Sequence, residues 1–142
     1  MIQYILAMLF SLAISTKTIA QVDNFDHIAN QWSEGEFDEN GAIVNKNKRA
    51  GLYRLKIYKD HYAVFNYPYS CGAGRKKEGH WVLNPNDTTL TFNFSTETAY
   101  YTDQTVTISE IETYKILKLS KKILKIQLVD SINPIIYSYI KN

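Results

Sequence analysis

The chain has 142 residues, of which 45% are hydrophobic and 13% aromatic, and its formal net charge at pH 7 is +2. This length suffices for one domain with a substantial core and is too short for two domains of ordinary size. The near-neutral charge argues against general binding to nucleic acid or to membrane surfaces, and the single cysteine, Cys71, excludes an internal disulfide.

The first 20 residues have the pattern of a secretory signal peptide. Residues 4–14 are apolar except for Ser11, a run typical of a signal-peptide core and too short to span a bilayer. Thr18-Ile19-Ala20 then fits the site that a signal peptidase reads, which predicts cleavage after Ala20. The alternative, an uncleaved anchor, needs a longer apolar run. We therefore expect an exported protein in the periplasm or medium, without stable membrane insertion, whose mature domain covers residues 21–142.

After this leader, the sequence predicts one short helix followed by strands. Residues 23–31 fit a helix capped by Asp23 or Asn24. Beyond it, apolar and polar residues alternate with a period of two, which is typical of strands with one face in a core. The expected strands cover residues 32–37, 52–58, 62–67, 80–83, 88–95, 105–111, 114–119, 123–129 and 135–140. Polar or glycine-rich residues predict long loops over 40–50 and 70–79.

Short turns separate most of these strands, as at residues 59–61, 84–87 and 120–122. Connections this short favour an antiparallel up-and-down meander, because parallel pairing requires long crossovers. A meander of about eight or nine strands must close into a barrel or fold into a sandwich to hide its edges. We expect an all-β, antiparallel up-and-down barrel.

Several motifs occur in an order that resembles a known family. A glycine–x–tryptophan strand precedes an apolar strand, and a tyrosine–x–isoleucine strand turns into a leucine-rich partner. The residues concerned are Gly79-His80-Trp81-Val82-Leu83, Leu90-Thr91-Phe92, Tyr114-Lys115-Ile116 with Leu119, and Leu124, Ile126 and Leu128, after an opening Gln31-Trp32-Ser33-Glu34-Gly35. This order resembles the lipocalin-like domains of exported bacterial proteins. The resemblance implies a barrel with a central cup that binds a small apolar molecule.

The candidate ligand-binding residues are apolar side chains on the predicted inner faces of the strands. They are Tyr53, Leu55, Ile57, Trp81, Leu83, Leu90, Phe92, Phe94, Ile126 and Leu128. A barrel of about eight strands is either filled by such side chains or holds one small ligand. Two functions follow: a non-enzymatic barrel that binds a small hydrophobic or amphipathic ligand, or a filled-core interaction module that contacts a protein or an envelope component.

No pattern predicts catalysis, a metal site or a cofactor. Cys71 lies near basic residues and His80, but it lacks the motif of a thiol enzyme, so a loop or partly buried thiol without a catalytic role is the preferred interpretation. An intermolecular disulfide is a further alternative. His27, His61 and His80 lack the close spacing of zinc ligands, and His61 is expected in a turn.

Acidic and basic clusters are interpreted as solvated surface. Glu34, Glu36 and Asp38 share one strand face, whereas a glycosidase needs carboxylates facing each other across a substrate. The lysines between residues 115 and 125 are expected on outward faces and strand edges, where such residues prevent edge-to-edge aggregation. We therefore expect no nucleic-acid partner. The sequence leaves the oligomeric state open.

Overall fold

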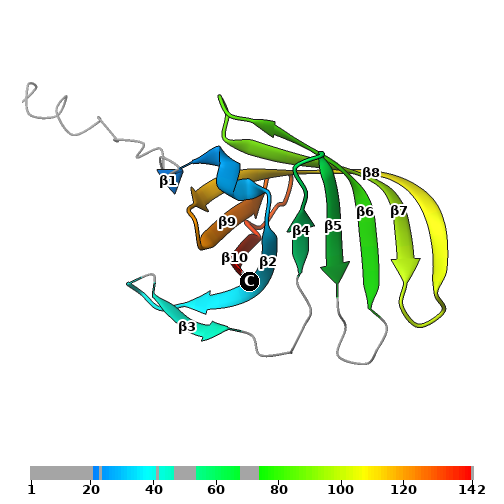
Figure 1. Cartoon of the computed structure of the whole chain (residues 1–142), viewed down its shortest axis with the longest axis horizontal. Helices are drawn as coiled ribbons and strands as arrows, with labels where there is room; N and C mark the ends of the chain where they lie inside the picture. Colours follow the sequence, from blue (N-terminus) through cyan, green and yellow to red (C-terminus); the bar gives the residue numbers. More distant parts are fainter. Residues whose placement is uncertain (1–20, 23, 41, 47–53, 68–73, 142) are drawn as a thin grey trace, which may run out of the picture.

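The computed structural model describes residues 21–22, 24–40, 42–46, 54–67 and 74–141. It shows strands throughout these residues and a single turn of 3-10 helix (Figure 1). The elements are β1 (Gln21–Val22), η1 (Phe25–Ile28), β2 (Gln31–Phe37), β3 (Ile43–Lys46), β4 (Leu55–Ile57), β5 (Tyr62–Tyr67), β6 (Arg75–Asn84), β7 (Thr89–Ala99), β8 (Gln104–Leu119), β9 (Ile123–Leu128) and β10 (Ile136–Lys141). The predicted all-β class is confirmed.

Eight of these strands close into an antiparallel barrel. The order around the described barrel is β8-β7-β6-β5-β4-β2-β10-β9, and β9 returns to β8. The eight barrel strands are neighbours in the order in which they follow along the chain. β10 completes the ring against β2, with Ile140 opposite Ser33. The predicted up-and-down barrel is thus confirmed. Outside the ring, β1 pairs in parallel with the end of β8, and β3 pairs with β2.

The inward side chains form one hydrophobic core. Trp32, Phe92, Tyr114 and Tyr139 are among its largest buried members. The indole nitrogen of Trp32 donates to the carbonyl of Ile28 at 3.0 Å, which fastens η1 to the barrel wall. Within the described residues, no helix has the length and apolar character needed to cross a bilayer.

The structure corrects four predicted boundaries. The strands expected at 105–111 and 114–119 are one strand, β8, because the residues between them continue the ladder with β7. The expected loop at 40–50 contains β3. The loop expected at 70–79 ends earlier, since the charged residues from Arg75 onward pair with both β5 and β7. The predicted helix is reduced to η1, capped by the Asn24 side chain, which accepts from the Asp26 amide at 2.8 Å.

Residues 1–20, Tyr53 and Cys71 lie outside the described residues. The predicted signal peptide, the lining role of Tyr53 and the interpretation of Cys71 therefore stay predictions.

Candidate functional site

The predicted lining residues are divided between the core and two pockets. Leu55, Ile57, Leu90, Phe92, Phe94 and Ile126 are buried in the core. Four of these, Leu55, Leu90, Phe92 and Ile126, have no accessible surface, so no water-sized void borders them. Trp81 and Leu83 line a pocket at one end of the barrel, and Leu128 lines a pocket elsewhere.

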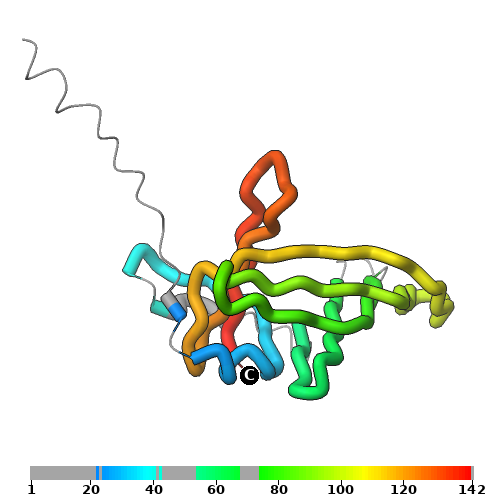
Figure 2. The backbone as a smooth tube through the Cα atoms, turned by 90° about the horizontal axis from the view of Figure 1, so that it is seen from above, coloured from blue at the N-terminus to red at the C-terminus, as the bar shows by residue number. Residues whose placement is uncertain are grey.

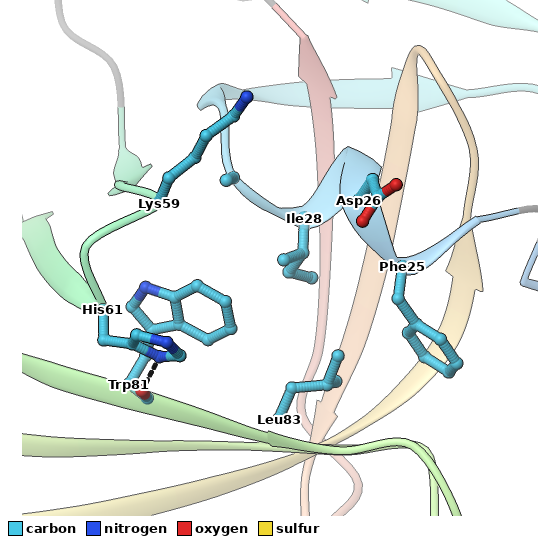
Figure 3. Close-up of a pocket in the computed structure, with 8 residues that line it drawn as sticks. Phe25, Asp26, Ile28, Lys59, His61, Trp81 and Leu83 are labelled. Carbon is cyan, nitrogen blue, oxygen red and sulfur yellow. Dashed lines mark hydrogen bonds between the residues drawn. The ribbon is translucent and has the colours of Figure 1, made fainter.

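The first of these, here called the η1 pocket, lies between η1, the β4–β5 turn and β6 (Figure 3). Its volume is about 440 Å³, within the ~300–1,000 Å³ range of small-molecule sites. It is lined by Phe25, Asp26, Ile28, Ala29, Lys59, His61, Trp81 and Leu83. The η1 pocket therefore has the size and the enclosing elements of a ligand site.

Trp81 forms one wall of the η1 pocket and is fixed from two sides. Its indole nitrogen donates to the carbonyl of Tyr58 at 2.8 Å. The imidazole of His61 lies beside the indole, with ring centroids 4.9 Å apart, and Nδ1 is 3.3 Å from the Trp81 carbonyl oxygen (Figure 3). Because the polar atom of the indole already has a partner, Trp81 offers only apolar ring surface to the pocket.

Polar groups occur at the rim of the η1 pocket. Asp26, Lys59 and His61 are exposed, whereas Ile28 and Trp81 are buried. This arrangement can enclose the apolar body of a small molecule and leave its polar end near a carboxylate, an ammonium and an imidazole.

A second pocket, here called the mouth pocket, lies at the opposite end of β5 and β6. Its volume is about 340 Å³. It is lined by Tyr67, Arg75, Lys77, Glu110, Ile111, Glu112, Thr113, Tyr114, Leu128, Asp130 and Tyr137. Unlike the η1 pocket, it contains several charged side chains that belong to the inner face of the barrel.

Lys77 is the centre of the charged cluster in the mouth pocket. Its side chain is only 4% exposed, and its ammonium lies 2.6 Å from a Glu110 carboxylate oxygen and 3.1 Å from one of Glu112. The ammonium also lies 5.4 Å from the Tyr67 ring centre, within the range of a cation–π contact. A buried ammonium is thus compensated by two carboxylates and an aromatic face.

Titration behaviour follows from these contacts. The hydrogen bond from Lys77 holds the pKa of Glu110 below its ordinary value. Burial raises the pKa of Tyr114 well above its ordinary value, and its hydrogen bond to Glu112 adds to this effect. Burial likewise raises the pKa of Tyr67. At neutral pH the pocket therefore combines the ionised Glu110 carboxylate with the neutral phenols of Tyr67 and Tyr114.

Lys77, Glu110 and Glu112 were missed by the sequence analysis, although strand parity contains a signal for two of them. Counting back by twos from the buried Tyr114 along one continuous strand places Glu112 and Glu110 on the inner face. The expected strand break near residue 111 interrupted that count, and Lys77 lay in an expected loop.

Of the acidic residues predicted to share one strand face, Glu34, Glu36 and Asp38, only two are exposed on the surface. Glu36 and Asp38 are exposed, as expected, but Glu34 is half-buried and pairs with Arg54 at 2.8 Å. Asp38 accepts hydrogen bonds from the amides of Asn40 and Ala42 and so stabilises a turn. In the part of the chain that the structure describes, no group of three histidine, cysteine or acidic side chains is arranged to hold a metal ion.

Comparison of the chain with protein-family models, with curated proteins and with solved structures finds no match.

Proposed function

We propose that this protein is a non-enzymatic, lipocalin-like binding protein that takes a small hydrophobic or amphipathic molecule in the η1 pocket. The observation that carries this proposal is the division within a pocket of about 440 Å³: apolar walls from Phe25, Ile28, Trp81 and Leu83, with polar groups at the rim. Burial of apolar ligand surface supplies the binding energy, at about 25 cal/mol per Å² before the cost of association.

The test uses an amphipathic fluorescent dye, 1-anilinonaphthalene-8-sulfonate, titrated into the purified protein. Ala29 lines the η1 pocket, so Ala29→Phe should fill it and weaken dye binding by at least about tenfold. Val82→Phe is the matched control, because Val82 lies between Trp81 and Leu83 on β6 but is 56% exposed on the outer face. Equal dye affinities in the two variants and the parent would contradict the proposal.

A filled-core interaction module is the second candidate. It is favoured by the fully buried core residues and by large apolar side chains exposed outside the barrel, including Ile111, Ile132 and Ile136. A protein that binds no dye in the η1 pocket but still has a saturable protein or peptide partner would support this candidate.

Export is proposed as the setting for either function. Its support is the short apolar run before Ala20 in the sequence. N-terminal sequencing of protein from the envelope or the medium should begin at Gln21 or within a few residues of it. A mature chain that begins at Met1 would refute this part of the proposal.

A further inference from the structure

The N-terminal half of β8 is an edge of the sheet. β9 pairs with β8 only from Tyr114 onward, and the last bond on that side joins the Val129 amide to the Thr113 carbonyl at 2.9 Å. Before Thr113, β8 pairs with β7 on one side and with no strand on the other among the described residues. Figure 1 shows this half of β8 at the margin of the sheet, beyond β7.

The backbone of this edge is available for pairing. The Ile116 amide donates toward β7, to the Thr88 carbonyl, whereas the Thr113 carbonyl accepts from the opposite side. Because N–H and C=O groups alternate along an antiparallel strand, those of Ile111 point to the unpaired side.

Two common blocking residues are missing from this edge, although it has a β-bulge opposite Phe94 and Thr96 and the inward carboxylates of Glu110 and Glu112. Natural edge strands are commonly blocked by lysine or proline, and residues 104–113 contain neither. They are instead rich in threonine, valine and isoleucine, which favour extended backbone.

Exposed apolar side chains lie beside this edge. Ile111 is 69% exposed. The connection between β9 and β10 begins against β8 at Val129 and projects from the barrel (Figure 2). It exposes Val129, Ile132 and Ile135, and Ile136 at the start of β10 is also exposed. An extended chain on the edge would cover part of this apolar surface.

The inner side of the same edge is acidic. Glu110 and Glu112 alternate with Ile111 and face the mouth pocket, which Asp130 also lines. The cations of this pocket are Lys77, which is held between the two glutamates, and Arg75, whose guanidinium also pairs with Glu97. Carboxylates therefore exceed cations, and the pocket favours an incoming positive charge.

We propose that residues 104–113 of β8 dock an extended segment of a partner protein by adding it to the sheet, with a lysine or arginine side chain of that segment entering the mouth pocket. Side chains alternate along an extended chain. The neighbours of the basic residue then face the outer side, where Ile111 and the β9–β10 connection present apolar surface. Backbone hydrogen bonds to β8 hold the segment, and the mouth pocket selects a segment with a positively charged side chain.

The probe is a short capped peptide of alternating threonine and valine with one central lysine, compared with the same peptide carrying glutamate. Amide NMR titration should show saturable binding of the lysine peptide centred on Ile111 and Thr113, and at least about tenfold weaker binding of the glutamate peptide. Ile111→Pro removes the edge amide and should weaken lysine-peptide binding by at least about tenfold, since proline is tolerated on an edge but cannot donate. Ile111→Val keeps both the amide and an apolar side chain and should bind as the parent does.

Dye binding at the η1 pocket provides a control for folding, and Ile111→Pro should leave it unchanged. Absence of lysine-peptide binding, equal affinity for both peptides, or indifference to Ile111→Pro would each overturn the proposal. A dimer seen by sedimentation and abolished by Ile111→Pro would also overturn it, because the edge would then be occupied by a second copy of the chain.

Discussion

The imidazole of His61 and the indole of Trp81 form a tilted pair, with ring centroids 4.9 Å apart and an angle of 32° between the ring planes. His61 reaches this position because its backbone is left-handed, with φ of +68°, and the Trp81 amide donates to the His61 carbonyl at 2.8 Å. One turn residue thus reverses the chain between β4 and β5 and also helps to enclose the η1 pocket.

Two substitutions at His61, both of which remove the imidazole, isolate the role of its left-handed backbone. His61→Gly should change the free energy of unfolding by no more than about 1 kcal/mol, because glycine adopts positive φ without steric cost. The free energy of unfolding of His61→Val should be lower than that of His61→Gly by about 1–2 kcal/mol, because a β-branched residue is strained in the left-handed conformation. Urea unfolding measures both variants, and equal losses would show that the left-handed turn contributes nothing.

Trp81 and His80 lie on opposite faces of β6, as strand parity predicted. Trp81 is 7% exposed and His80 is exposed. Trp81→Ala should lose about 3–5 kcal/mol, the usual range for a buried large aromatic, and His80→Ala should stay within about 0.5 kcal/mol. Urea unfolding of the two variants is the measurement, and a larger loss for His80→Ala would contradict the assigned faces.

Replacement of Lys77 should produce a pH-dependent loss of stability. Lys77→Met leaves Glu110 and Glu112 without their counter-ion and should cost about 3 kcal/mol at pH 7, the lower end of the range for broken buried pairs, because Glu110 is 44% exposed. Lys77 lowers the pKa of Glu110 below its ordinary 4.5. The stabilisation is therefore present above that ordinary value and lost as pH falls through the lower folded pKa.

The difference in the free energy of unfolding between the parent and Lys77→Met should accordingly shrink below about pH 4.5. Urea unfolding across a pH series measures this difference. Lys76→Met is the control, because Lys76 pairs with Glu78 at a half-exposed site and should cost no more than about 1 kcal/mol. A stability difference for Lys77→Met that is constant with pH would refute the charge-pairing explanation.

Gly79 lies where β6 and β7 approach closely. A Cβ atom there would be 2.0 Å from the Asn93 carbonyl oxygen and 2.7 Å from the Phe94 Cα, and backbone atoms cannot yield easily. Gly79→Ala should therefore cost at least about 3 kcal/mol, the upper part of the usual range for overpacking.

Gly35→Ala is the matched comparison for Gly79→Ala, since its Cβ would meet the side-chain end of Ile140 at 2.1 Å. That side chain can change rotamer, so the loss should be smaller, about 1–3 kcal/mol. Thermal unfolding ranks the two variants, and a larger loss at Gly35 would show that the β6–β7 contact relaxes freely.

The sequence by itself determined the fold class and most inner faces of the strands. Alternation with a period of two is a local property, so it identifies which side chains share a face wherever the strand continues unbroken. Trp81, Leu90 and Phe92 were assigned to the interior in this way, and each is buried. Short turns favoured antiparallel over parallel pairing, which left a closed barrel or a sandwich as ways to hide the edges. The ring of strand pairings in the structure decides for the barrel.

Only the tertiary structure decided where the pockets lie and which charges are buried. The η1 pocket forms only where η1, the β4–β5 turn and β6 come together. These elements are far apart in the sequence, and no local pattern predicts that they become neighbours. Glu110 and Glu112 can face the interior because Lys77 supplies a counter-charge from β6, with β7 between the two strands. A charged side chain is stable inside only with a partner, and that partner is set by pairing between residues far apart in the chain.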